Sequence, residues 1–321
     1  MEDPDGTVGQ PPGFPRADDH GPHARHPTAS TGVTVVVCSR DRAAFLRAAL
    51  AAVTASLRPQ DELVVVDSAS TDTEVAVVAA QSGARVLRAA APGLGRARNV
   101  GWRAASRPLV AFTDDDCAPN ADWTAQVEAA FADDTVGYAF GQVVGGEGAG
   151  EPLSLADSTV ARRVEPHERA DGLGHGANMS CRRAALADVD GFDDELGAGA
   201  RFPAAEDTDL VLRLQRAGWA GVFRPESIVA HHQWRDRLPA LRIMYRYGVG
   251  AGAVAAKSWR LGAGSGRLRA EVWDEGLRMS ARHLRAGYQF GAAACVLRAV
   301  GSTVGALRSR RLPLAAGRFQ P

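Results

Sequence analysis

Short apolar runs alternate with longer amphipathic segments in the first third of the chain. The runs are VTVVVC at 33–38, LVVVD at 63–67, ARVL at 84–87 and PLVAFT at 108–113. Helical spacing of apolar residues follows the first three runs, over about 41–53, after Thr71 and over about 95–105. Because the runs are continuously apolar, they predict parallel strands that helices cover on both faces. The expected class is α/β, with a Rossmann-like, mostly parallel sheet.

Polar residues follow three of these runs. Ser39, Arg40 and Asp41 come after the first run, Asp67, Ser68 and Ser70 lie at or after the end of the second, and Asp114 to Asp116 follow the fourth. Ligands of such sheets bind outside the carboxyl ends of the strands. We therefore expect a binding site among these residues.

The second half of the chain is less regular. It predicts a strand near 136–143, a segment GHGANMSCR at 174–182, a helix at 207–216 and two short strands at 221–224 and 228–232. After Pro239 the pattern is helical to the end, interrupted by glycines at 248, 250, 252, 262, 264 and 266. Residues 286–307 are largely apolar, but they are rich in Ala and Gly and contain Arg298. This predicts a helix at a membrane interface or packed on the domain, rather than a spanning one.

The length of 321 residues predicts one large domain with an appendage. Residues 1–32 hold six of the 17 prolines and show no apolar periodicity, so a disordered N-terminal tail is expected there. The catalytic or binding domain is expected at 33–235, and a basic helical extension at 236–321. The four cysteines are far apart, which argues against disulfides and structural zinc.

Charge is unevenly distributed, although the formal net charge is zero. Residues 257–321 hold twelve Lys or Arg and three acids, so this part carries +9 and the rest −9. A solvated face and an anionic membrane surface both fit such a segment, and we expect no nucleic-acid partner. Since no signal peptide opens the chain, the expected location is the cytoplasm, with peripheral attachment to the inner face of the cell membrane as the open alternative.

The triplet Asp114, Asp115 and Asp116 is the first candidate for chemistry. Two unit charges about 4 Å apart repel by about 4 kcal/mol at an effective dielectric near 20, so a positive partner is expected. Mg²⁺ or Mn²⁺ is suited to this role, because these cations take carboxylate oxygens together with substrate phosphates. In extended chain Asp114 and Asp116 would point to one side and Asp115 to the other. The alternative is an acidic turn in which one Asp caps a helix beginning near Asn120.

A second acidic cluster, Glu206, Asp207 and Asp209, opens the segment EDTDLVLRLQRAGW. Capping and the helix dipole account for one or two of these acids.

Eight segments together resemble the inverting family 2 glycosyltransferases with the GT-A fold, over most of 34–232. In chain order they are VTVVVCSRDR, VVVDSASTD, GLGRARNVGWRAA, VAFTDDDCAP, HGANMSCRRAAL, GFDDEL, EDTDL and VAHH. The resemblance implies transfer of one sugar from a UDP-, GDP- or dTDP-sugar to a carbohydrate or lipid-linked acceptor, in cell-envelope, polysaccharide or glycoconjugate synthesis. Departures at Cys38, Ser68 and Asp190 bear on nucleotide preference.

The resemblance also assigns roles to residues. It implies Mn²⁺ or Mg²⁺ at Asp114, Asp116 and His231, a general base at Asp207 with Glu206 beside it, and donor contacts at Ser39, Arg40, Asp67, Ser70, Arg98 and Asp115. For His231 a buried, hydrogen-bonded histidine is an equal alternative, and for Arg98 a surface arginine is.

Four other functions are alternatives to glycosyl transfer. A haloacid dehalogenase-like phosphatase needs a D-x-D-x-T pattern, whereas residues 114–118 read DDDCA. A dehydrogenase needs G-x-G-x-x-G after the first strand, where this chain has CSRDR. A processive synthase needs a Q-x-x-R-W element, which is absent after Asp207. A catalytically inactive module that binds nucleotide-sugars stays open.

Overall fold

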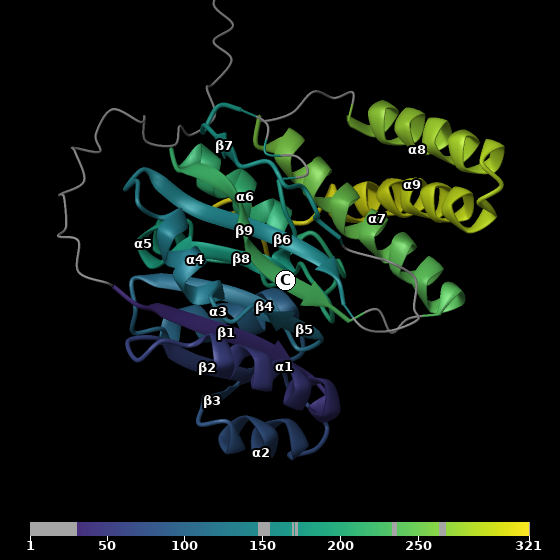
Figure 1. Cartoon of the computed structure of the whole chain (residues 1–321). Helices are drawn as coiled ribbons and strands as arrows, with labels where there is room; N and C mark the ends of the chain where they lie inside the picture. Colours follow the sequence, from purple (N-terminus) through teal and green to yellow (C-terminus); the bar gives the residue numbers. More distant parts are fainter. Residues whose placement is uncertain are drawn as a thin grey trace, which may run out of the picture.

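A nine-stranded mixed sheet lies at the centre of the molecule (Figure 1), in the order β3-β2-β1-β4-β8-β6-β9-β5, with β7 paired to β9. The computed structural model describes residues 31–146, 155–168, 170, 173–232, 236–262 and 268–320. The predicted N-terminal tail lies outside these residues up to position 30. The strands are β1 Val33–Ser39, β2 Glu62–Asp67, β3 Arg85–Arg88, β4 Leu109–Asp114, β5 Cys117–Pro119, β6 Val136–Gly145, β7 Arg162–Val164, β8 Met179–Arg182 and β9 Ala220–His231.

The first four strands are parallel, as the continuous apolar runs predict. β1 pairs with β2 and β4, and β2 pairs with β3. β8 runs antiparallel to both β4 and β6, and β5 and β7 run antiparallel to β9, so the second half of the sheet is mixed. The two short strands expected at 221–224 and 228–232 are wrong as separate elements. They form one strand, β9, which follows β6 past an irregularity in the register.

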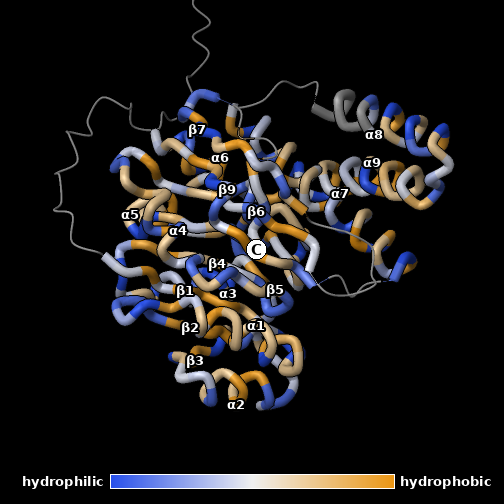
Figure 2. The backbone as a smooth tube through the Cα atoms, viewed as in Figure 1, coloured by the Kyte–Doolittle hydropathy of each residue, from blue (hydrophilic) through white to orange (hydrophobic). Residues whose placement is uncertain are grey.

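Helices cover both faces of the sheet (Figure 1). They are α1 Ala43–Ser56, α2 Glu74–Gln81, α3 Leu94–Ala104, α4 Trp123–Ala130, α5 Arg183–Asp188 and α6 Glu206–Arg216, with a short 3-10 turn at Gly176–Asn178. Successive residues of a strand point to opposite faces. Val36 and Phe112 accordingly pack in the cluster that contains α3, α5 and α6 residues, whereas Val35 and Ala111 pack with α1, α2 and α4. Figure 2 shows the resulting hydrophobic colouring of the central strands.

Three helices follow the sheet: α7 Arg237–Arg260, α8 Leu268–Arg285 and α9 Gln289–Ser309. The expectation that glycines at 248, 250 and 252 interrupt the helical segment is wrong, because all three lie inside α7. A Cβ at Gly252 would lie 1.9 Å from the Ser302 carbonyl oxygen, and one at Gly305 would lie 1.9 Å from that of Val249. These glycines therefore allow the backbones of α7 and α9 to touch.

The chain does not remain helical to its end. β10 Leu314–Ala315 and β11 Arg318–Phe319 form a hairpin with a two-residue loop, Ala316-Gly317. Both loop residues have positive φ, 49° and 73°, which is the conformation of a type I′ turn. Phe319 packs in a third apolar cluster with Phe202 and the α7 residue Val249.

Candidate active site

A cleft of about 510 Å³ opens beyond the carboxyl ends of β1 and β4. It is the location expected for a ligand in a sheet of this kind. The ends of β1 and β4, the start of α3, the turn at 174–176, the start of α6, and helices α7 and α9 all contribute. Of the predicted site residues, the cleft is lined by Ser39, Arg40, Arg98, Asp114, Asp115, Asp116, Glu206, Asp207 and His231.

Arg42 pairs with two carboxylates of the triplet. Its Nη1 lies 2.9 Å from Asp115 Oδ1, and its Nη2 lies 2.7 Å from Asp116 Oδ2. The Ser39 hydroxyl donates a 2.7 Å hydrogen bond to the other oxygen of Asp115. Burial raises the pKa of Asp115 to about 7, and the charge of Arg42 opposes this rise. Burial also acts on Asp116, but the hydrogen bond from His231 and the charge of Arg42 outweigh it and lower its pKa.

The triplet does not alternate as extended chain would. β4 ends at Asp114, and Asp115 and Asp116 form a turn before β5. Asp115 and Asp116 consequently share Arg42, while Asp114 is paired with Arg98. The expectation that Asp115 points away from both neighbours is wrong because the turn rotates the last two carboxylates together.

Arg98 links the triplet to the second acidic cluster. Its Nη2 lies 3.1 Å from Asp114 Oδ1, and its Nη1 donates to Glu206 Oε1 over 2.9 Å. The same Nη2 donates to the Gly176 carbonyl oxygen. Arg98 is buried, so the alternative of a surface arginine is wrong. Burial raises the pKa of Glu206 to about 7, against the charge of Arg98. Segments 108 residues apart in the chain are therefore joined by a guanidinium.

Asp207 stands at the first turn of α6 and lines the cleft. Its Oδ2 accepts a 2.9 Å hydrogen bond from the Gly176 amide, and its Oδ1 accepts one from the Thr208 amide. These bonds fix the position of both carboxylate oxygens at the start of the helix. Capping does not account for Asp209, which is buried in an ion pair with Arg213.

Asp116, Cys117 and His231 place a ligand atom each within 4.8 Å of one another, and all three are buried. The pairing of β5 with β9 sets Cys117 opposite His231 in register. His231 Nε2 lies 3.4 Å from Asp116 Oδ1. Carboxylate oxygen suits Mn²⁺ and Mg²⁺, and neutral imidazole is a common ligand of divalent metals. Burial raises the pKa of the Cys117 thiol and keeps it protonated. The donor set therefore fits a divalent cation at Asp116 and His231, and Asp114 stands apart with Arg98.

Asp67 and Ser70 do not line the cleft, although Ser68 between them does. Asp67 Oδ1 accepts a hydrogen bond from the Ser70 amide over 2.8 Å, and its other oxygen pairs with Arg88. Arg40 does line the cleft, and its Nε lies 3.4 Å from Asp41 Oδ2.

Sequence reasoning missed Arg42, Tyr247 and Arg298 in the cleft. Repulsion within the triplet requires a nearby positive charge, and Arg42 lies in the polar segment after the first strand. The sequence therefore contained enough information to predict Arg42 as a partner of the triplet. Nothing comparable marks Tyr247 on α7 or Arg298 on α9, because their position depends on how these helices pack on the domain.

Residues 34–193 match the family described as Glycosyl transferase family 2. A pre-mycofactocin glycosyltransferase of Mycobacterium tuberculosis is 30% identical over 220 residues, which cover 65% of this chain and 45% of that protein. An N-acetylglucosaminyl-diphospho-decaprenol L-rhamnosyltransferase of the same organism is 41% identical over 71 residues, 22% of each chain. The chain thus covers less than half the length of either relative.

Solved structures share the fold. A mannosyltransferase from Pyrobaculum calidifontis, in complex with GDP-Man and Mn²⁺, has a TM-score of 0.57 and 19% identity, covering 88% of this chain and 89% of that one. Residues 1–349 of S. aureus TarS, in complex with UDP, give a TM-score of 0.51 and 17% identity, covering 90% and 96%. These likenesses establish a GT-A-like α/β fold with a helical C-terminal part.

Proposed function

The chain belongs to glycosyl transferase family 2, and we propose that it transfers a single sugar from a nucleotide-sugar to an acceptor hydroxyl, with inversion at the anomeric carbon. The observation that carries this proposal is the position of Asp207. Its carboxylate lines the same cleft as the acidic triplet and is fixed by the Gly176 and Thr208 amides. A carboxylate held in this way is suited to act as a general base.

In the proposed reaction Asp207 takes the proton of the acceptor hydroxyl. The acceptor oxygen then forms a bond to the anomeric carbon while the bond from that carbon to the phosphate oxygen breaks. The nucleoside diphosphate leaves with the electron pair of that bond. Glu206 adjoins Asp207 and holds Arg98, whose charge helps to fix the position of the base.

Asp116 and His231 are proposed to hold Mn²⁺ or Mg²⁺. Asp114, which is paired with Arg98, is proposed as a further ligand that would join them when the cation binds. The cation would act as a Lewis acid that neutralises charge on the leaving diphosphate. Two facts support this: the donor set of Asp116 and His231, and the Mn²⁺ in the structurally similar mannosyltransferase.

The donor is proposed to be a UDP-, GDP- or dTDP-sugar, since similar structures contain GDP-Man and UDP-GlcNAc. Ser39, Arg40 and Asp115 line the cleft and are proposed to contact it. Arg98 would support donor binding indirectly, because its guanidinium holds the carboxylate of Asp114 in place. Asp67 and Ser70 are proposed to shape the part of the cleft wall that contacts the nucleobase of the donor. They would act through Ser68, which lies between them in the chain and lines the cleft.

The acceptor is proposed to be a carbohydrate or lipid-linked sugar of cell-envelope, polysaccharide or glycoconjugate synthesis. Tyr247 and Arg298 place an aromatic ring and a positive charge on the cleft wall, and stacking and charge pairing suit such an acceptor. The proposed location is the cytoplasm, at the inner face of the membrane where lipid-linked acceptors occur.

Donor binding and turnover separate the two proposed roles. Asp116→Ala should abolish Mn²⁺-dependent donor binding measured by calorimetry. Asp207→Asn should keep that binding and lower the rate of transfer, or of slow donor hydrolysis, by roughly a hundredfold or more. The exposed Asp157→Asn provides the matched control and should change neither quantity.

Specific outcomes would contradict these assignments. Donor binding that survives EDTA would contradict the assignment of a metal site. Full turnover by Asp207→Asn would contradict the assignment of Asp207 as the general base. Should the protein bind nucleotide-sugars without any transfer or hydrolysis, and should Asp207→Asn change nothing, the chain would be a catalytically inactive binding module.

A further inference from the structure

Exposed apolar side chains concentrate on the three C-terminal helices. Of the eleven large hydrophobic side chains that are exposed among the described residues, eight lie on or beside these helices: Leu238, Trp259, Leu277, Leu284, Tyr288, Val296, Val300 and Leu307. Scattered single residues of this kind are normal, but a concentration marks a contact surface.

The outward face of α9 is apolar along its length. It carries Ala293, Val296, Leu297, Val300, Val304 and Leu307, at helical spacings of three and four residues. Val296, Val300 and Leu307 are 37%, 36% and 45% exposed. By length and composition α9 could cross a membrane, yet its opposite face is buried against α7 and α8. One face therefore belongs to the fold, and the other is partly exposed among the residues that the structure describes.

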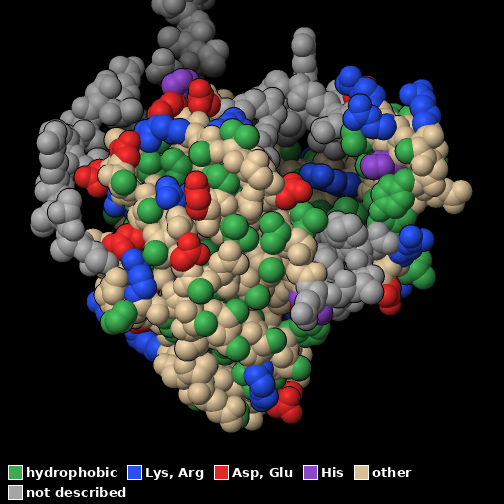
Figure 3. All heavy atoms as spheres, viewed as in Figure 1, with side chains coloured by type: hydrophobic (Ala, Val, Ile, Leu, Met, Phe, Trp, Pro, Cys, Tyr) green, Lys and Arg blue, Asp and Glu red, His purple; other side chains and the backbone are tan. Residues whose placement is uncertain are grey.

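Helix α8 carries a second stripe, formed by Leu277, Ala281 and Leu284, with the two leucines more than half exposed. Arg278, Arg282 and Arg285 follow each of these positions by one residue and form a basic edge beside the stripe. An apolar stripe with an arginine edge is the pattern of a helix that lies in a membrane interface. Figure 3 shows Lys and Arg side chains gathered over α8.

The contacts between α8 and α9 place the two stripes on one side. Gly276 and Ser280 of α8 face α9, since a Cβ at Gly276 would lie 3.2 Å from that of Ala299, and the Ser280 hydroxyl donates to the Ala292 carbonyl. An α-helix turns by about 100° per residue. On each helix the apolar stripe is therefore rotated by about 90° from the residues that make this contact, in the direction of increasing residue number. Because the helices are antiparallel, both rotations turn the stripes to the same side of the hairpin.

We propose that this face of the α8–α9 hairpin docks on an anionic lipid bilayer. The leucine and valine side chains would enter the acyl boundary, and Arg282 and Arg285 would meet lipid phosphates. Arg308, Arg310 and Arg311, at and after the end of α9, add positive charge to the same hairpin. The proposal does not depend on the reaction that the cleft performs.

Co-sedimentation of the full chain with phosphatidylglycerol–phosphatidylcholine vesicles tests the proposal, and pure phosphatidylcholine vesicles serve as the neutral reference. The chain should bind the anionic vesicles more strongly. Val296→Asp with Val300→Asp should weaken this binding by about tenfold or more, because two apolar anchors are lost. Arg282→Glu with Arg285→Glu should weaken it by about fivefold per arginine at low salt, and less at high salt.

Two controls match these variants. Val77→Asp on α2 and Arg47→Glu on α1 alter exposed residues far from the hairpin in the chain and should leave vesicle binding unchanged. Arg282→Glu with Arg285→Glu should keep the unfolding transition of the parent, since both side chains are exposed. Val296 and Val300 are only 37% and 36% exposed, so the unfolding transition of their variant is compared with that of the parent, and the arginine variant decides the test if stability is lost. Absence of binding to anionic vesicles, or equal binding by the hairpin variants, would overturn the proposal. A concentration-dependent dimer that Val296→Asp with Val300→Asp abolishes, without vesicle binding, would assign the face to a second copy of the chain instead.

Discussion

A buried cluster of four charged side chains joins α6, α7 and the loop before α6. Lys257 Nζ lies 2.6 Å from Asp193 Oδ2 and 2.5 Å from Asp209 Oδ1, and Arg213 Nε lies 2.9 Å from Asp209 Oδ2. Lys257 is 1% exposed, so its ammonium has exchanged water for these carboxylates. Two positive and two negative groups balance, and removal of one member leaves a buried charge without its partner.

Asp209→Asn should lower the free energy of unfolding by about 3 kcal/mol at neutral pH. Burial opposes ionisation of Asp209, but the charges of Arg213 and Lys257 outweigh it and lower its pKa. A lowered pKa stabilises the fold above the unfolded value of about 3.9, and this contribution is lost as pH falls through the folded value. Urea unfolding between pH 7 and about pH 3 should therefore show the variant and parent converging below about pH 4. Asp157→Asn should track the parent throughout, and a constant gap for Asp209→Asn would contradict the ionic origin.

The side-chain partners of single residues in the cleft could be predicted only in part from the sequence. The positive partner of the triplet was expected as a metal, whereas Arg42 already supplies a charge to Asp115 and Asp116. Asp67 was expected beside the donor but is paired with Arg88, a contact that depends on the spacing of β2 and β3. Pairings between side chains far apart in sequence require the register, which no local pattern contains.

Among the helices, the α7–α9 pair depends most on the absence of side chains. Gly248 and Gly252 of α7 face Gly301 and Gly305 of α9, and a Cβ at any of the four would lie 1.9 to 2.2 Å from a carbonyl oxygen of the other helix. The same glycines predict a broken helix from propensity alone, since each costs about 1 kcal/mol relative to Ala. Close packing of the pair offsets this cost, which explains why local propensity gave the wrong result.

Gly305→Ala should therefore destabilise the protein by about 3 kcal/mol, because the helices must separate to admit the methyl group. Gly145→Ala is the matched control, since a Cβ there meets nothing within 4 Å and its φ is not positive. It should change the free energy of unfolding by less than about 0.5 kcal/mol. Chemical denaturation followed by circular dichroism measures both variants. Equal midpoints would mean that the backbones of α7 and α9 are not in contact.

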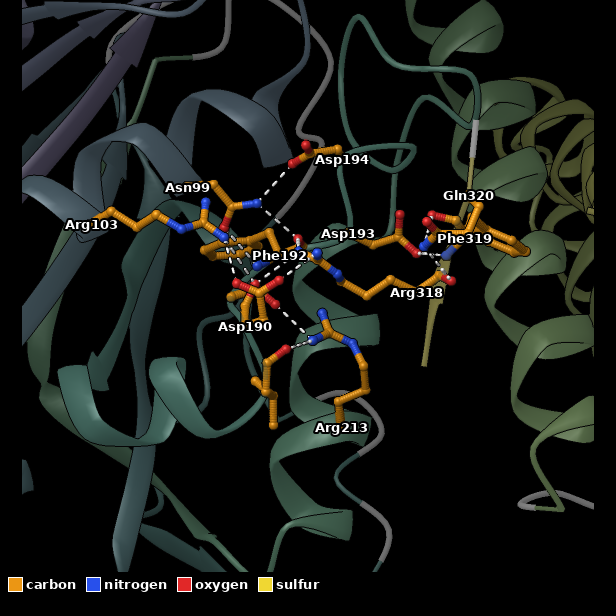
Figure 4. A network of polar contacts seen from close by, with 12 residues as sticks. Asn99, Arg103, Asp190, Phe192, Asp193, Asp194, Arg213, Arg318, Phe319 and Gln320 are labelled. Atoms are coloured by element: carbon orange, nitrogen blue, oxygen red, sulfur yellow. Dashed lines mark hydrogen bonds and ion pairs between the residues drawn. The ribbon is translucent and has the colours of Figure 1, made fainter. Parts of the chain in front are cut away.

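At the level of the whole molecule, the sheet and its covering helices follow from the hydrophobic pattern, but the end of the chain does not. The hairpin formed by β10 and β11 reaches back across the fold to the loop at 190–196 (Figure 4). Arg318 Nη1 donates to the carbonyl oxygens of Asp190 and Phe192, and the Phe319 amide donates to Asp193 Oδ2. The sequence LAAGRF has no Asn-Gly or Asp-Gly turn signal, so the hairpin could not be expected from it.

The loop that the hairpin holds continues into the cleft. Asn99 on α3 fixes its other side by donating to the Phe192 carbonyl and to Asp194 (Figure 4). The following residues, Ala198 and Gly199, line the cleft. The last residues of the chain and α3 therefore position the same wall, which couples the C-terminal hairpin to the site.

Phe319→Ala tests this coupling. The ring is 4% exposed, packs 5.2 Å from the ring of Phe202 and lies under the Lys257 ammonium, so its loss should cost about 3 kcal/mol of unfolding free energy. Amides of residues 193–199 should also exchange hydrogen faster, because the loop loses its anchor while the sheet remains. Hydrogen exchange read by mass spectrometry separates the two effects. Leu307→Ala, at an exposed position, should alter neither. Since the cleft wall is built on this loop, unchanged exchange at 193–199 in a destabilised Phe319→Ala would show that α3 alone positions it.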